Sequence, residues 1–97
     1  GVATPTEAFA AIAAGATGIK AFPAEAIPPI AIKAWKAVLP KDIPVFAVGG
    51  VTPDNMKPYV EAGASGFGIG GALYKPGADV AVIAQKAKQF IEAMQGI

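Results

Sequence analysis

A repeated pattern constrains the fold of this chain more than any other feature of its sequence. Residues 4–5 (TP) recur as residues 52–53, and AGATG at residues 14–18 recurs as AGASG at residues 62–66, 48 positions further on in both cases. Threonine followed by proline is typical of a helix start. The Thr side chain can accept a hydrogen bond from a free backbone amide, and Pro, which has no N–H group, loses no hydrogen bond at the first helical position. Glycine after a helix suits the left-handed position that ends it. The repeat therefore predicts two units in which a strand follows a helix.

Seven helices and strands are expected along the chain. Helices are expected over residues 6–14, 30–39, 55–62 and 79–95, and strands over residues 18–22, 45–48 and 66–69. The last helix has the clearest pattern, since its apolar residues, from Val80 to Met94, recur at helical spacing while Lys86, Lys88 and Glu92 take the other face. Pro58 lies inside the third helix, so this helix is expected either to kink or to begin late.

Strands that alternate with helices predict a parallel sheet with right-handed crossovers, and hence an α/β fold. A complete barrel typically takes about 250 residues, whereas this chain has 97. Short strands rich in Gly and Ala do not close a core alone. The chain also begins with Gly1 rather than Met. We therefore expect it to be part of a larger α/β domain.

Composition narrows the possible functions. The chain contains no Cys and no His, which excludes disulfides, thiol nucleophiles and imidazole bases, and leaves only carboxylates for a metal site. The eight basic residues are scattered lysines and the net charge is +1, which does not favour a nucleic-acid surface. No apolar run reaches transmembrane length and no signal segment is present. We expect no membrane partner and a cytoplasmic location.

Lys20 stands alone in the apolar stretch TGIKAFPAE at residues 17–25. Side chains alternate along a strand, so Lys20 points into a barrel interior if Ile19 and Ala21 face the helices. A structural ion pair, or a side chain that reaches water, would also explain a strand lysine. Alternatively, desolvation can leave such an amine uncharged and nucleophilic near neutral pH, and its attack on a carbonyl gives a Schiff base.

Glycine-rich stretches follow the second and third strands. VGGV occupies residues 48–51 and GIGG residues 68–71, both at the carboxyl ends of expected strands, where α/β enzymes bind their ligands. Backbone amides without neighbouring Cβ atoms can close around an anion, although tight turns need glycine as well. Two such turns beside Lys20 favour a phosphate site.

Three stretches resemble the 2-keto-3-deoxy-6-phosphogluconate and 2-keto-3-deoxy-6-phosphogalactonate aldolases. They are GVATPTEA at residues 1–8, KAFPAE at residues 20–25 and VFAVGGVTP at residues 45–53. The resemblance covers essentially the whole chain but roughly the C-terminal half of the family's barrel. It implies that residues 1–97 are a partial domain, the C-terminal part of a (β/α)8 TIM barrel with about three parallel strands and four helices, in which the N-terminal part is absent.

The resemblance also implies roles for individual residues. The family's lysine that forms a Schiff base with pyruvate matches Lys20, and Phe22 and Pro23 fall in the substrate pocket. The glycines of the phosphate-binding turns match Gly49, Gly50, Gly70 and Gly71. Gly71 stands where the family usually has a serine, so a hydroxyl donor is lost while the backbone amide remains.

The family's proton-transferring glutamate and its carboxylate-binding arginine lie on early strands that this chain does not contain. Glu7 is interpreted as part of a helix cap and Glu25 lies beyond the strand end, so neither is assigned that role. Trp35, on the second helix, is expected to pack rather than to bind a ligand.

The function implied by the resemblance is that of a class I aldolase, conditional on the rest of the barrel. It would cleave a 2-keto-3-deoxy-6-phospho sugar acid, of gluconate or galactonate type, to pyruvate and glyceraldehyde 3-phosphate. No cofactor or metal is needed, the full-length protein would be a homotrimer, and the isolated chain would have little or no activity. Two alternatives stay open: a natural or engineered partial barrel that binds phosphate or serves as a scaffold without catalysis, or one half of a two-chain barrel whose sheet edges need a complementing N-terminal fragment.

Overall fold

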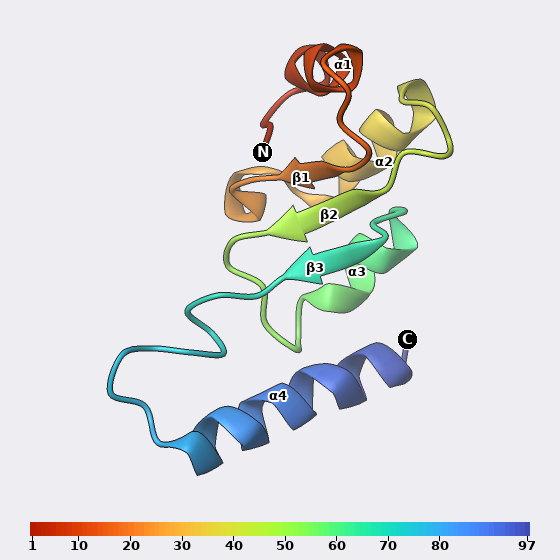
Figure 1. The fold of residues 1–97 in the computed structure, drawn as a ribbon. Coiled ribbons are helices and arrows are strands. Elements are labelled where there is room, and N and C mark those ends of the chain that lie inside the picture. Colours follow the sequence, from red (N-terminus) through yellow and green to blue (C-terminus); the bar gives the residue numbers. More distant parts are fainter.

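The computed structural model describes residues 1–97 and confirms the predicted parallel α/β sheet (Figure 1). The three strands lie in the order β1, β2, β3, and each pair is parallel. The strands are β1 (Ile19–Ala21), β2 (Val45–Val48) and β3 (Gly66–Gly68). The helices are α1 (Pro5–Ala13), α2 (Pro29–Val38), α3 (Met56–Glu61) and α4 (Val80–Gln95), and a short 3-10 helix, η1 (Ala24–Ala26), was not expected from the sequence. This arrangement fits part of a TIM barrel.

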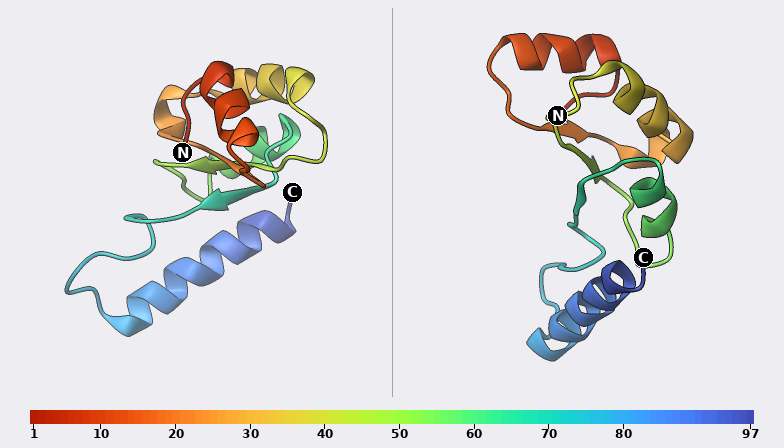
Figure 2. Two further views of the ribbon diagram at one scale, coloured as in Figure 1. Left: turned by 45° about the horizontal axis from the view of Figure 1, so that its top comes forward. Right: turned by 90° about the vertical axis from the view of Figure 1, so that its right-hand side faces the viewer.

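The helices leave one face of the sheet uncovered (Figure 2). Ile19 and Ala21 of β1 point toward the helices and are buried, as are Val45 and Ala47 of β2. Lys20 lies between the two buried residues of β1 and points to the opposite, open face, where it is exposed to solvent. The predicted direction of Lys20 is therefore confirmed. Lys20 is not buried in this chain as a barrel interior would bury it, because nothing covers the open face.

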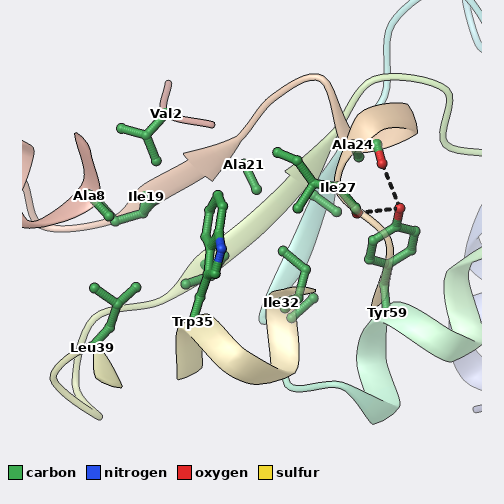
Figure 3. Close-up of a cluster of buried hydrophobic side chains, with 13 residues drawn as sticks. Val2, Ala8, Ile19, Ala21, Ala24, Ile27, Ile32, Trp35, Leu39 and Tyr59 are labelled. Carbon is green, nitrogen blue, oxygen red and sulfur yellow. Dashed lines mark hydrogen bonds between the residues drawn. The ribbon is translucent and has the colours of Figure 1, made fainter. Parts of the chain in front are cut away.

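The main hydrophobic core lies between the sheet and the helices (Figure 3). Helix α2 contributes Ile32 and Trp35, and Leu39 follows at its end; all three are buried, so Trp35 is a packing residue as expected. Tyr59 of α3 reaches the same core, where its ring meets that of Phe67 edge-on at a centroid distance of 6.4 Å. The core thus fixes β1, η1 and α3 relative to one another.

Both copies of the repeat end their helices as predicted. Gly15 follows α1 with φ of 103°, and Gly63 follows α3 with φ of 108°, which is the left-handed conformation that glycine adopts most easily. In each copy the amide of this glycine and that of the next residue donate back to carbonyls of the last helical turn. Each helix is therefore closed by the same hydrogen-bonded cap before the chain enters the next strand.

The helix starts differ between the two copies. Thr4 accepts from the amide of Glu7, and the Glu7 carboxylate accepts from the Thr4 hydroxyl and the Ala3 amide, which confirms the predicted cap of α1. Thr52 does not cap α3, which begins four residues later at Met56. Pro58 is the third residue of this short helix, where its missing donor costs no internal hydrogen bond. Of the two expectations for Pro58, the late start is the correct one.

Helix α4 has the predicted extent, but most of its apolar residues are not buried. Asp79 caps it by accepting from the amide of Ala81, and the helix packs at the β3 edge of the sheet beside α3 (Figure 1). Phe90 is its only buried residue, whereas Val80 is 79% and Ile91 58% exposed. An apolar groove of about 310 Å³ separates part of α4 from β3. No helix of the chain is both long enough and apolar enough to span a membrane.

Candidate functional site

A cavity of about 480 Å³ opens at the carboxyl ends of β2 and β3, the end of a parallel sheet where ligands bind. The structure brings five of the residues singled out from the sequence to its wall: Phe22, Gly49, Gly50, Gly70 and Gly71. The remaining lining residues are Val48, Val51, Gly68, Ala72 and Lys75. The two glycine-rich turns therefore share one cavity, as the topology predicted, and their proposed role in phosphate binding stays a prediction.

The turn after β2 requires glycine for steric reasons. Gly49 and Gly50 have φ values of 107° and 67°, a region that other residues rarely occupy. A Cβ atom on Gly50 would lie 2.8 Å from Cδ of Glu25, and one on Gly49 would lie 3.3 Å from Cα of Pro23. The side chain of Glu25 and the backbone of Pro23 thus pack directly against this turn. Pro23 packs against the turn and does not line the cavity.

Asn55 holds the same turn from its other side. Its Nδ2 donates to the Gly50 carbonyl at 2.8 Å, and its Oδ1 accepts from the Thr52 amide at 3.0 Å. These two bonds fix the orientation of the peptide groups that follow Gly50. Sequence reasoning missed this residue, although an asparagine in the turn sequence VTPDN was a usable signal, since Asn commonly bonds to nearby backbone.

The turn after β3 uses its glycines differently. A Cβ atom on Gly68 would lie 2.7 Å from Cγ2 of Val48, so close strand packing requires this glycine. A Cβ atom on Gly70 or Gly71 would meet nothing within 4 Å, and neither of these residues has a positive φ. Their backbone faces open space in the cavity. A ligand can therefore approach the main chain closely at these two positions.

Lys20 lies next to this cavity but does not line it. Its Nζ is 5.4 Å from the centroid of the Phe22 ring, within the range of a cation–π contact, and Phe22 is part of the cavity wall. On its outer side, β1 is bridged by Val2, whose amide donates to the Lys20 carbonyl at 2.8 Å. The backbone of Lys20 is thus paired on both sides, with Val2 on one and β2 on the other.

The 3-10 helix η1 places Glu25 against the glycine turn. The Tyr59 hydroxyl donates to the carbonyls of Ala24 and Ile27, at 2.7 Å and 2.9 Å, and so ties η1 to α3 (Figure 3). Burial, and secondarily the negative charge of Glu25, raises the pKa of Tyr59 above its ordinary value. The hydroxyl therefore stays protonated and able to donate through the neutral pH range.

The cavity wall contains one charged residue, which is positive. Lys75, in the loop between β3 and α4, is the only charged lining residue, and the sequence analysis did not single it out. No three carboxylates lie close enough together to hold a metal ion. The wall therefore combines backbone amides with one ammonium group, an arrangement suited to an anion.

Comparisons with known proteins agree with this geometry. The family model described as "KDPG and KHG aldolase" matches residues 1–93. The chain is 54% identical over 93 residues to a 2-dehydro-3-deoxy-6-phosphogalactonate aldolase of Escherichia coli (strain K12), with 96% of this chain and 45% of that protein covered.

Two solved structures are similar as well. A "Native KDPGal structure" and a "cube-shaped, highly porous protein cage designed by fusing symmetric oligomeric domains" each superpose with a TM-score of 0.95 at 52% identity, covering 98% of this chain. The chain covers 46% of the first and 35% of the second. It thus spans less than half the length of the proteins that it matches.

Proposed function

Because the chain belongs to the KDPG and KHG aldolase family, we propose that the full-length protein is a class I aldolase. Its substrate is a 2-keto-3-deoxy-6-phospho sugar acid, and its products are pyruvate and glyceraldehyde 3-phosphate. The name of the 54% identical relative favours the galactonate configuration over the gluconate one. The observation that carries the proposal is the position of Lys20 on the open face of β1, beside a cavity walled by two glycine turns.

The proposed chemistry begins at Nζ of Lys20. The uncharged amine attacks the keto carbon of the substrate, and uptake of a proton with loss of water gives a protonated imine. The bond between C3 and C4 then breaks, its electron pair moves toward the imine nitrogen, and the C4 hydroxyl gives its proton to a base in the rest of the barrel as the aldehyde forms. The resulting enamine takes up a proton at C3, and water releases pyruvate and regenerates the lysine. Lys20 and Phe22 face the pyruvate part, while the glycine turns hold the phosphate.

In this proposal, residues 1–97 form part of a single barrel domain, and the rest of the barrel covers the open face. Covering that face would desolvate Lys20 and thereby favour its uncharged form. Exposed apolar side chains on α4 and the similarity to a designed cage of symmetric oligomeric domains support an oligomer of the full-length protein. We further propose that this oligomer is a homotrimer and that the protein works in the cytoplasm.

Borohydride trapping tests the proposal directly. The full-length protein is incubated with pyruvate and borohydride, and its intact mass is measured before and after, followed by peptide mapping. We expect one reduced pyruvate adduct, on Lys20, and no adduct in Lys20→Met. The variant Lys33→Met, which removes an exposed lysine of α2, serves as the control and should be trapped normally. A full-length protein that gives no adduct on Lys20 would refute the aldolase proposal.

A second candidate function is phosphate binding or scaffolding without catalysis. It is favoured by the exposure of Lys20. Lys20 forms no ion pair, since the two ion pairs of the chain are Lys57–Glu61 and Lys88–Glu92. Inorganic phosphate would then bind at the glycine turns, while pyruvate would never be trapped. The trapping experiment, repeated with a phosphate titration, separates this function from catalysis.

A further inference from the structure

We propose that Lys75 binds the phosphate group of the substrate and supplies the positive charge of the phosphate site. This inference rests on the proposed function, which assigns the glycine turns to the phosphate. It adds a side chain that sequence reasoning did not select. The three observations that support it are the position of Lys75 in the cavity wall, the turn that holds it there, and its lack of any ionic partner.

The loop after β3 presents Lys75 to the cavity through two consecutive turns. In the first, the amides of Leu73 and Tyr74 donate to the Gly70 carbonyl, at 2.9 Å and 3.0 Å. This turn begins at the end of the second glycine-rich stretch. Gly71, within the turn, and Lys75, which follows it, are consequently brought to the same wall.

The second turn has the sequence KPGA at residues 75–78. The Ala78 amide donates to the Lys75 carbonyl at 3.0 Å, and Gly77 has φ of 84°. Proline at the second position and a glycine of positive φ at the third define a type II turn, which is specified by its own sequence. The backbone of Lys75 is therefore held by a turn that its own sequence specifies.

The charges around the site favour an anion at this position. Apart from Lys75, the lining residues are Gly, Ala, Val and Phe, which contribute only backbone donors. Lys75 forms no salt bridge, since the ion pairs of the chain involve Lys57 and Lys88. Its ammonium is thus available, and a lysine acting as a point charge is a common partner of phosphate. Gly71 carries no side-chain donor, so Lys75 supplies the side-chain contact that the turn lacks.

The test compares Lys75→Met with Lys75→Arg and with the control Lys33→Met in the full-length protein. Lys75 and Lys33 are both exposed, so neither substitution disturbs the core. We measure kcat/KM for the 6-phosphorylated 2-keto-3-deoxy sugar acid and for the same acid without phosphate, and inhibition by inorganic phosphate. Loss of one charged hydrogen bond predicts a fall of roughly 10- to 100-fold for the phosphorylated substrate in Lys75→Met.

The unphosphorylated acid should be used equally well by Lys75→Met and by the unaltered protein. Lys75→Arg should keep most of the activity on the phosphorylated acid, and Lys75→Met should be inhibited far less by inorganic phosphate. If Lys75→Met behaves like Lys33→Met toward both acids and toward phosphate, the assignment of Lys75 is wrong. Pyruvate trapping on Lys20 is measured in the same samples: its absence in the unaltered protein would refute the aldolase proposal itself, independently of Lys75.

Discussion

The hydroxyl of Tyr59 donates a hydrogen bond of 2.7 Å to the carbonyl of Ala24, which lies 35 residues earlier in the chain. With a second bond to Ile27, it fastens η1 to α3 within the core. Since η1 carries Glu25 and follows Pro23, and both pack against the Gly49–Gly50 turn, the shape of that turn depends on a residue that does not touch the cavity.

Replacing Tyr59 with Phe should therefore destabilise the protein. The ring keeps its packing against Phe67, but the carbonyls of Ala24 and Ile27 each lose the bond from the hydroxyl, and the Ala24 carbonyl keeps only its bond from the Ile27 amide. We expect the free energy of unfolding to fall by about 1–3 kcal/mol. Urea unfolding of the full-length protein measures this change. Tyr74→Phe, which removes a hydroxyl from an exposed side chain, is the matched control and should have no measurable effect; an equal effect of both variants would contradict the role of the Tyr59 bonds.

Tyr59 also predicts a loss of stability in alkaline solution. Its pKa is raised above 10.0 in the folded protein, chiefly by burial, so the unfolded chain releases this proton first as the pH rises. The contribution of this raised pKa to the free energy of unfolding is complete below about pH 10 and is lost as the pH rises through the folded-state pKa of Tyr59. Thermal unfolding measured from about pH 8 to pH 11 should show a steeper decline for the unaltered protein than for Tyr59→Phe. Parallel curves for the two proteins would contradict this prediction.

The two glycine turns should respond differently to alanine. Gly50→Ala forces a side chain into a φ of 67° and against Glu25, so we expect a cost of at least about 1–2 kcal/mol. In Gly71→Ala the added Cβ atom would meet open space, and the φ of Gly71 is not positive. The free energy of unfolding should therefore change by less than about 0.5 kcal/mol. Chemical denaturation of both variants checks the contrast. Similar losses in the two would show that the turn after β2 is not held as tightly as its contacts indicate.

Much of this fold was predictable because its signals are local. The left-handed glycines Gly15 and Gly63 are specified by the repeat, and the open-face position of Lys20 follows from alternation along β1. The prediction that Thr52 caps α3 was wrong, because the side chain of Asn55 accepts from the Thr52 amide and α3 starts only after Asn55. The apolar pattern of α4 located the helix but not its burial, since burial depends on what packs against it.

The site was only partly predictable for a related reason. Glycine turns at strand ends are visible in the sequence, and parallel strands bring them together. Lys75 follows an irregular loop and looks like any exposed lysine until the loop is folded. Likewise, η1 is three residues long and has no periodicity, so nothing in the sequence indicated that it places Glu25 on the Gly50 turn.

The isolated chain of 97 residues should show little or no aldolase turnover. Its open sheet face leaves Lys20 exposed to solvent, without the enclosure that the rest of the barrel would form around a bound keto acid, and leaves Phe22 and Phe46 49% and 38% exposed. A coupled assay for pyruvate release, run beside the full-length protein at equal molar concentration, measures the difference. Adding the remaining part of the barrel as a separate chain should restore activity if the two parts associate. Normal turnover by the isolated chain would show that the open face needs no cover, and that the conditional form of the aldolase proposal is wrong.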